Sequence, residues 1–355
     1  TGAMSAGISG LKAHMDALNV VGNNVANVNT QGYKPGRVTF MESIYSTQSA
    51  GSAGTATVGG TNPRQTGYGV GIGTIDLDMS SRSLDSTGRG MDCAIQGDGF
   101  FLVGDKTHDI DSMDALKGLT LTRVGNFEFR DGYLTDGQGN VVYGFITRSN
   151  GDAPGTTPGD KPSTDLVPIR LPMKSTDPNS KGDAVYVGVD NQTGANVYPD
   201  NDPAATVDGF VDLENISIDK NGKITGTNKD TGDPVVVGYI ALGSVENLNG
   251  VLHTEGPYYT AGDAAGDIRV GTPGNSVTGN LRNDKITDGN NVVAPDSALA
   301  EGSGATLMTG FLEASGTDLA AEFANMIIYQ RGYQANTRIV TVTDTMLEEL
   351  VNMKR

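Results

Sequence analysis

Both ends of the chain carry apolar residues at the heptad spacing of a coiled coil. Between residues 4 and 18 the steps alternate between four and three, and from 319 to 347 the pattern repeats every seven residues. Such a seam is narrower than the apolar face of a helix that covers a globular core. The predicted seam residues are Met4, Ile8, Leu11, Met15, Leu18 and Val25 in the first helix and Leu319, Met326, Tyr333, Val340, Leu347 and Leu350 in the last.

The two helices are predicted to pair with each other as a coiled-coil-like domain made of residues 1–29 and 318–355. One such pair leaves much apolar surface in water, so further copies of the chain are expected to cover it. The alternative is that both helices cover the rest of the chain as ordinary surface helices. The long segment after Asn29 argues against this alternative, because it can hold the first helix away from the body.

Asparagine is concentrated where the first helix ends, in the stretch "NNVANVNTQGYK" at residues 23–34. Its side chain competes with the helical backbone for hydrogen bonds and tolerates left-handed backbone angles. Gly32 and Pro35 follow the cluster and favour an exit into extended chain. The residues assigned to this exit are Asn23, Asn24, Asn27 and Asn29.

Residues 30–70 are predicted to be an extended arm that lies between subunits. Glycine, serine and threonine dominate them, as in "STQSAGSAGTATVGGTNP", and this composition alone is typical of a flexible linker. An apolar group interrupts the polar segment. In a flexible linker these side chains would be exposed to water and would contact nothing. The group comprises Tyr33, Phe40, Met41, Ile44 and Tyr45, of which Tyr33, Phe40 and Ile44 are assigned as arm contacts.

The segment between the helices is predicted to be mainly β. It combines many of the 50 glycines with alternating apolar residues, and Asp131-Gly132 and Asp136-Gly137 are hairpin signals. Residues 71–147 and 233–310 are expected to form a first β-domain. Residues 148–232 are rich in Asp, Pro, Gly, Asn and Thr, and are expected to form a second β-rich domain inserted into the first. The predicted fold class is therefore mainly β with helical termini.

Charge and composition exclude several classes of partner. The net charge of −17 argues against nucleic acid and against anionic membranes, since both bind clustered Lys and Arg. No apolar stretch of about 18 residues is present to span a membrane, and no basic and apolar segments of a secretory signal peptide are found. The single cysteine, Cys93, cannot form an intramolecular disulfide and is expected in a strand core.

The sequence contains no recognisable catalytic or metal-binding pattern. The three histidines, His14, His108 and His253, lie far apart, and His14 is expected to be solvated. The stretch "DKNGK" at 219–223 lacks the later ligands of a calcium loop and is predicted to be a turn. We expect neither an enzyme nor a cofactor or metal.

With these features in place, the chain resembles the flagellar rod and hook protein family. The resemblance lies in "SAGISGLKAHMDALNVVGNNVANVNTQGYK", in "EFANMIIYQRGYQANTRIVTVTDTMLEELVNMKR" and in the β-segments "MDCAIQGDGFFLV" and "LTRVGNFEFRDGYLTDGQGNVVYGF". The segments "LENISIDKNGKITG" and "EGPYYTAGDAAGD" resemble the hook branch of that family. Two departures are visible: Gly316-Thr317 replaces a usual Asn-Val, and Cys93 replaces an aliphatic residue.

The resemblance implies a structural subunit of the bacterial flagellum. It implies a helical homopolymer whose terminal helices form an inner tube, with the arm between subunits and the β-domains outside. For the hook branch it implies a bending joint that transmits torque, with the distal rod protein, the hook cap and the hook–filament junction proteins as partners. It further implies an extracellular location, reached by flagellar export without a cleaved signal peptide.

Three alternatives are considered. A hook-associated junction protein is disfavoured, because the closing "MLEELVNMKR" resembles the hook branch more. Within the family, the distal rod protein is the alternative, although it is typically shorter and lacks a sizeable inserted middle segment. From another class, a secreted carbohydrate-binding or hydrolytic β-protein has a similar composition, but it does not need heptads at both ends. Assembly into tubes separates the two classes.

Overall fold

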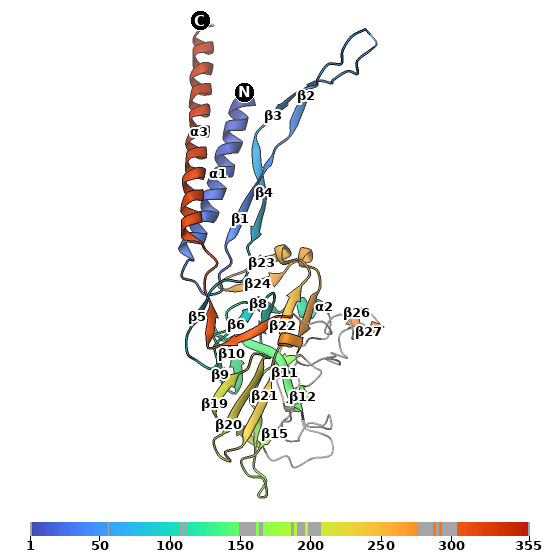
Figure 1. The fold of residues 1–355 in the computed structure, drawn as a ribbon, viewed down its shortest axis with the longest axis vertical. Helices are drawn as coiled ribbons and strands as arrows, with labels where there is room; N and C mark the ends of the chain where they lie inside the picture. Colours follow the sequence, from blue (N-terminus) through green and yellow to red (C-terminus); the bar gives the residue numbers. More distant parts are fainter. Residues whose placement is uncertain are drawn as a thin grey trace. The chain divides into compact units, whose positions relative to one another are not determined.

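A computed structural model describes residues 2–55, 57–106, 110, 113–148, 161–162, 166–185, 188–189, 196–197, 207–275, 287–288, 291–292 and 304–353. The chain divides into two compact units. Unit 1 contains residues 1–30, 34–78 and 315–355, and unit 2 contains residues 31–33 and 79–314. Unit 1 holds the two terminal helices and unit 2 is mostly β-sheet, so the predicted fold class, mainly β with helical termini, is confirmed (Figure 1).

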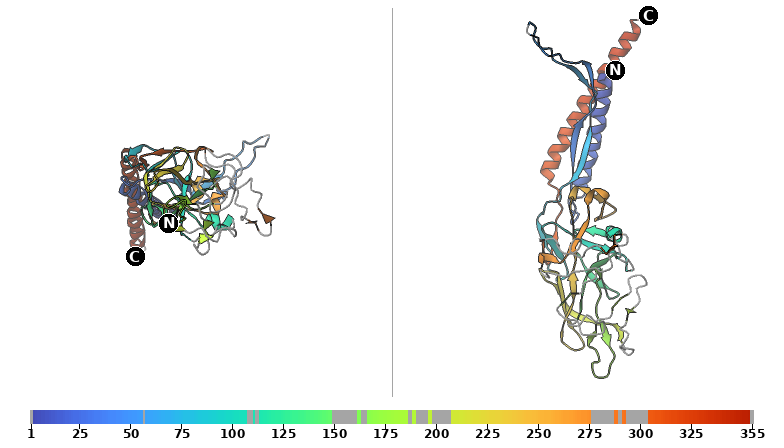
Figure 2. Two further views of the ribbon diagram at one scale, coloured as in Figure 1. Left: turned by 90° about the horizontal axis from the view of Figure 1, so that it is seen from below. Right: turned by 90° about the vertical axis from the view of Figure 1, so that its right-hand side faces the viewer.

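Unit 1 combines two long helices with a β-ribbon. The chain ends lie at the same end of the helix pair, so the helices run antiparallel, and they lie side by side in both side views (Figures 1 and 2). Asp318 begins the second helix as its N-cap and accepts hydrogen bonds from the amides of Ala320 and Ala321 at 2.9 and 3.3 Å. The elements are α1 Gly2–Ala26, β1 Gly36–Glu42, β2 Tyr45–Ser49, β3 Arg64–Gly67, β4 Val70–Leu77 and α3 Leu319–Asn352.

Within the segment predicted as an extended arm, strands β1, β2 and β3 take part in a two-stranded ribbon. Strand β1 pairs antiparallel with β4, and further along β2 pairs with β3. The chain therefore folds back on itself, and the stretch at 50–63, which is rich in glycine, alanine and threonine, connects β2 to β3. Strand β4, which was assigned to the first β-domain, belongs to this ribbon. Whether the ribbon lies between subunits stays a prediction.

In the described residues, unit 2 is built on a 14-stranded antiparallel sheet. Eight of its strands follow one another in the order β19-β20-β21-β11-β7-β8-β24-β23, and the other six pair with members of this series or with one another. Asp131 and Gly132 both have positive φ (51° and 79°) in the turn between β9 and β10, which confirms this hairpin signal. The sheet contains β7 Phe100–Gly104, β8 Thr120–Thr122, β9 Glu128–Arg130, β10 Tyr133–Thr135, β11 Val141–Arg148, β12 Lys161–Pro162, β13 Val167–Pro168, β19 Leu213–Ile218, β20 Lys223–Asn228, β21 Pro234–Ile240, β22 Leu242–Val245, β23 Val251–His253, β24 Tyr258–Ala261 and β25 Ile268–Gly271.

Smaller strand pairs complete unit 2. Helix α2 spans Met113–Lys117, and short 3₁₀ turns span Leu248–Gly250, Asp263–Ala265 and Pro273–Asn275. The pairs and one triplet are β5 Leu84–Ser86 with β29 Phe311–Glu313, β6 Cys93–Gln96 with β28 Thr306–Thr309, β14 Met173–Ser175 with β15 Ala184–Val185 and β18 Val207–Phe210, β16 Gly188–Val189 with β17 Asn196–Val197, and β26 Thr287–Asp288 with β27 Asn291–Val292.

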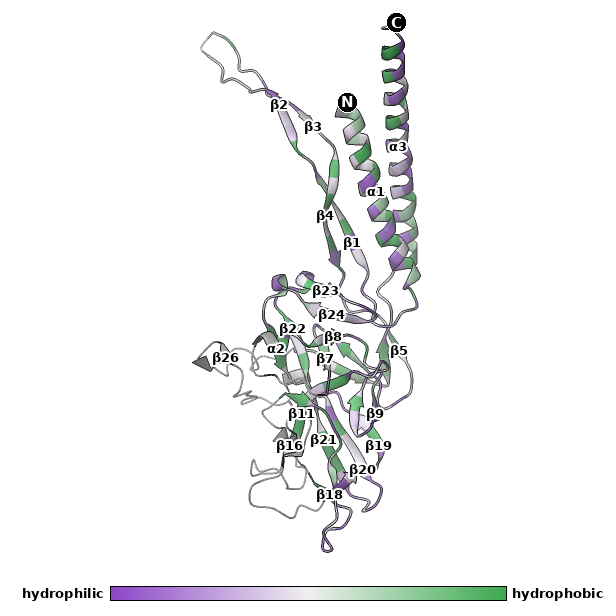
Figure 3. Cartoon of the chain, turned by 180° about the vertical axis from the view of Figure 1, so that it is seen from behind, coloured by the Kyte–Doolittle hydropathy of each residue, from purple (hydrophilic) through white to green (hydrophobic). Residues whose placement is uncertain are grey.

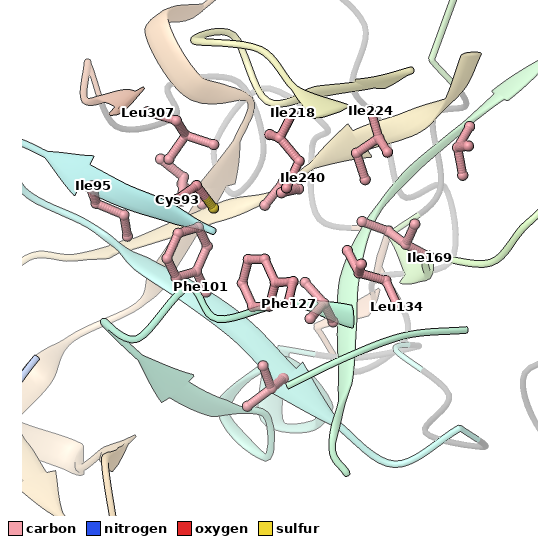
Figure 4. Close-up of a cluster of buried hydrophobic side chains, with 14 of the residues drawn as sticks. Cys93, Ile95, Phe101, Phe127, Leu134, Ile169, Ile218, Ile224, Ile240 and Leu307 are labelled. Atoms are coloured by element: carbon pink, nitrogen blue, oxygen red, sulfur yellow. The ribbon is translucent and has the colours of Figure 1, made fainter. Parts of the chain in front are cut away.

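Cys93 lies in the core of unit 2, as predicted. Its side chain is fully buried in β6 and packs in one apolar cluster with Phe101, Phe127 and Leu307 (Figure 4). Burial raises the pKa of the Cys93 thiol well above its ordinary value, with a further contribution from the neighbouring Asp92 charge. The thiol is therefore a packing group in the folded chain.

The same cluster contains residues assigned to the inserted domain. Ile169, Ile218 and Ile224 pack in one core with Phe101 of the first β-domain, and β19 and β20 extend the main sheet. The described part of 148–232 thus shares its core with residues outside it, which differs from the predicted boundaries. Most of residues 149–206 lie outside the described residues, and the nested division stays a prediction. The predicted turn at 219–223 is present between β19 and β20, where Gly222 has a φ of 77°.

Candidate assembly surface

Asn24 is the residue of the asparagine cluster that joins three elements of unit 1. Its side chain is 1% exposed; it accepts a hydrogen bond from the Gly36 amide at 3.0 Å and donates to the Gly36 carbonyl at 2.9 Å. It also donates to Glu322 Oε1 at 3.0 Å, and its carbonyl accepts from the Thr317 hydroxyl at 3.1 Å. Asn24 therefore fixes the end of α1 to the start of the ribbon and to the first turn of α3.

The neighbouring asparagines end the helix, as predicted. Asn27 donates its side-chain amide to the Asn23 carbonyl at 2.9 Å and to Asn23 Oδ1 at 3.0 Å, and it accepts from the Thr30 hydroxyl at 3.1 Å. These side-chain bonds surround the end of α1, where the Asn27 amide still donates to the Asn23 carbonyl at 3.1 Å. Asn29 is exposed.

Small residues, which the sequence analysis did not single out, bring α1 and α3 together. The buried residues of α1 are Gly7, Gly10, Ala13, Ala17, Val21 and Asn24. A Cβ at Gly7 would lie 3.1 Å from Val340 Cγ2, and one at Gly10 would lie 2.7 Å from the Asn336 side chain. On α3, a Cβ at Gly332 would lie 2.6 Å from the His14 ring. The repeat of Gly and Ala every three or four residues was the signal for this contact.

The predicted heptad residues lie beside this small-residue face, at the surface of the single chain. In α1, Ile8 is 50% and Met15 46% exposed, whereas Met4, Leu11, Leu18 and Val25 are half-buried. In α3, Leu319, Tyr333 and Leu350 are exposed, whereas Met326, Val340 and Leu347 are half-buried. The structure thus leaves five of the twelve predicted seam residues exposed, and the role of the seam in assembly stays a prediction.

Further apolar side chains are exposed along α3, and hydrophobic segments recur along both helices in Figure 3. Residues 346–353 are rich in them: Met346, Leu350, Val351 and Met353 are each at least 58% exposed. No residue of α3 in the described structure is fully buried. An exposed apolar surface of this extent is typical of a protein–protein contact. The exposed large apolar residues of α3 are Leu319, Phe323, Ile327, Ile328, Tyr333, Ile339, Val342, Met346, Leu350 and Val351.

Replacing Gly332 by Ala is expected to destabilise the helix pair of the unassembled chain. A glycine inside a helix costs about 1 kcal/mol relative to Ala, so alanine would stabilise an isolated helix. The added Cβ would meet the His14 ring at 2.6 Å, however, and overpacking of this kind costs about 1–3 kcal/mol. Gly22→Ala is the control, since a Cβ added there would have no atom within 4 Å, and it should stabilise. Thermal unfolding followed by circular dichroism measures both, and equal effects would contradict the close contact.

His14 is not solvated as expected but packs against two other rings in a cluster of three. Its centroid lies 5.4 Å from that of Phe40 and 6.2 Å from that of Tyr329, and Phe40 lies 5.7 Å from Tyr329 in an edge-on arrangement. Burial lowers the pKa of His14 below its ordinary value, because the cationic form loses hydration. Phe40 therefore contacts the helices of its own chain, which corrects its assignment as a contact to another subunit only.

The other two predicted arm contacts differ from each other. Tyr33 is 8% exposed and belongs to unit 2, so it is a core residue of its own chain. Ile44 is 78% exposed, and its neighbours Met41 and Tyr45 are 60% and 50% exposed. The ribbon around Ile44 is therefore the part that remains available for another copy.

A membrane-spanning helix and a metal-binding group of side chains are both absent from the described residues. No described helix combines the length and the apolar character that crossing a membrane requires. Among the same residues, His, Cys, Asp and Glu side chains form no group of three that could hold a metal ion. His108 lies outside the described residues.

Comparisons with known proteins agree with this geometry. Residues 308–353 match the family of the flagellar basal body rod FlgEFG protein C-terminal region, and residues 4–34 match the flagella basal body rod protein family. These two regions include most of α3 and α1.

Full-length relatives align over nearly the whole chain. The flagellar basal-body rod protein FlgG of Bacillus subtilis is 32% identical over 98% of this chain and 97% of its own length. The flagellar hook protein FlgE of Borreliella burgdorferi is 25% identical over 98% of each chain, and that of Salmonella typhimurium is 27% identical over 99% of each. The chain therefore belongs to the flagellar basal-body rod and hook protein family.

Proposed function

We propose that this chain is a structural subunit that self-assembles into the flagellar hook, a tubular joint that transmits torque from the rod to the filament. The observation that carries the proposal is the exposure of apolar residues along α3. A chain with a net charge of −17 that nevertheless exposes so many apolar side chains on one helix is suited to polymerise through that helix. The proposed role is structural, without catalysis.

The hook is favoured over the distal rod by two segments of the chain. The segments at 213–226 and 255–267, which resemble the hook branch, support the hook. The predicted insertion at 148–232 does not separate the two candidates, because the rod relative also aligns over 98% of this chain. The second candidate is the distal rod protein, which the 32% identity to a relative named as a rod protein supports. The hook relatives are 25% and 27% identical.

Neighbours in the flagellum follow from the same proposal. A hook subunit would meet further copies of itself along the tube, the distal rod protein at one end, and the hook cap and later the junction proteins at the other. It would reach the outside of the cell through flagellar export.

Electron microscopy of the concentrated protein tests the proposal. We expect tubes of uniform diameter whose curvature varies with conditions, because a joint must bend while it turns. Straight tubes under all conditions would favour the rod. A protein that stays monomeric at high concentration would contradict both candidates.

The ribbon offers a prediction that separates contacts within the chain from contacts between copies. Ile44→Ser should leave the melting temperature of the single chain unchanged and weaken the polymer, because Ile44 is exposed and a fully buried isoleucine contributes about 1.5–3 kcal/mol. Phe40→Ser should lower the melting temperature, since Phe40 packs on His14 and Tyr329. Thermal unfolding and sedimentation of the two variants measure this, and identical behaviour would contradict the distinction.

A further inference from the structure

Glu322 is a partly buried acid with one oxygen left unpaired. It lies in the first turn of α3, and its Oε1 accepts a hydrogen bond from Asn24 at 3.0 Å. Its Oε2 is buried and has no hydrogen-bond partner in the described residues. The side chain lines a small pocket of unit 1 together with Val20, Val38, Asn325 and Tyr329.

The groups around Glu322 do not neutralise it. Arg37 also lines the pocket, but its guanidinium lies 3.7 Å from the Asp76 carboxylate and its side chain is 76% exposed. The other neighbours are the Asn24 amide on α1, and Asp318 and the Tyr329 phenol on α3. Burial raises the pKa of Glu322, the Asn24 hydrogen bond opposes this, and the Asp318 charge adds to it.

The raised pKa means that folding favours the protonated form of Glu322, so the side chain contributes less stability at neutral pH than at acid pH. This contribution to stability is complete below the ordinary value of 4.5 and is lost as the pH rises through the folded pKa. Ionisation of this half-paired carboxylate therefore costs the unassembled subunit stability relative to the protonated acid. A cation from outside the chain would remove that cost.

We propose that the Glu322 pocket receives an arginine side chain from α3 of a second copy of this chain. The proposal rests on the proposed function, since it needs a polymer. The pocket suits such a side chain because Val20 and Val38 can contact the aliphatic stem, and the Glu322 side chain lines the same pocket. Its Oε2 is buried in the single chain, so the carboxylate would turn toward the pocket to accept from the guanidinium.

The arginines Arg331 and Arg338 on α3 meet the requirement. Both are exposed and lie seven residues apart, hence on one face of the helix. Ile327 and Ile328 precede Arg331 by one turn and Val342 follows Arg338 by one turn; the three are 59%, 61% and 55% exposed. Burying this apolar face against another copy would also bury the two cations, and a buried cation needs an acid.

The first arm of the test uses the single chain below its assembly concentration. Glu322→Gln keeps the shape and the hydrogen bond from Asn24 but removes the charge, so at neutral pH its melting temperature should equal or exceed that of wild type. Glu255→Gln removes the same charge at an exposed turn and should have no effect. A clear loss of stability in Glu322→Gln would overturn the inference, because the carboxylate would then be satisfied within its own chain.

The second arm measures the critical concentration for polymerisation of the full chain. Glu322→Gln should raise it at least about tenfold, because each arginine would be buried without an acid. Glu255→Gln should leave it unchanged. Glu322→Lys should abolish assembly, and one of the double variants Glu322→Lys/Arg331→Glu or Glu322→Lys/Arg338→Glu should restore it.

The outcomes separate this inference from the proposed function. A wild-type polymer together with an unchanged Glu322→Gln polymer overturns the inference alone. If neither double variant restores assembly, the acid does not pair with Arg331 or Arg338, and the inference is overturned. If Arg37→Glu restores the assembly of Glu322→Lys, the partner of Glu322 is Arg37, and the inference is overturned as well. A wild-type chain that forms no polymer overturns the proposed function, and the inference with it.

Discussion

Leu350→Asp is expected to abolish polymerisation while leaving the single chain unchanged. Leu350 is 58% exposed in the last turns of α3, where Met346, Val351 and Met353 are exposed as well. In a polymer that buries this end of the helix, an aspartate would be a buried charge without a partner. Removing one partner of a buried charge pair costs about 3–5 kcal/mol, and a similar cost would recur at every subunit.

A matched control lies in the same turn of the helix. Asn352→Asp introduces the same charge at an exposed polar position and should leave the polymer intact or weaken it only slightly. Sedimentation of concentrated protein gives the polymer fraction, and thermal unfolding of dilute protein tests the single chain. Normal tubes formed by Leu350→Asp would mean that the exposed apolar end of α3 does not face a neighbour.

Asn24→Ala is expected to destabilise unit 1 by roughly 3–5 kcal/mol. The substitution leaves the Gly36 amide, the Gly36 carbonyl and Glu322 Oε1 without the partners that Asn24 supplies. Each polar group left buried and unpaired costs about 1–3 kcal/mol. The end of α1, the start of the ribbon and the first turn of α3 should loosen together, since one side chain connects them.

Hydrogen exchange would localise the loss. In Asn24→Ala the amides of α1, β1 and the first turns of α3 should exchange faster, while those of the main sheet in unit 2 should not change. Asn29→Ala is the control, because Asn29 is exposed and a surface substitution of this kind changes stability by about 0.5 kcal/mol or less. Equal protection in Asn24→Ala and wild type would show that the three elements do not depend on this residue.

The sequence by itself determined the features that depend on local pattern. Heptad spacing predicted a helix at each end, the asparagine cluster predicted where the first helix stops, and Asp131-Gly132 predicted a hairpin. Cys93 was expected in a strand core and is there. Each of these follows from side-chain periodicity or from the backbone angles that single residues tolerate, so a short window of sequence contains the whole cause.

The tertiary structure decided everything that depends on partners distant in the sequence. Strand β1 pairs with β4 across the stretch at 50–63, whose composition is typical of a linker, and no local signal fixes such a pairing. His14 became a packing residue because Phe40 and Tyr329 approach it from two other elements. Asn24 differs from its neighbouring asparagines only because its side chain meets Gly36 and Glu322. The glycines and alanines of α1 form its buried face because α3 packs closely against them. Such small residues carry no apolar pattern of their own, so the sequence alone does not predict this contact.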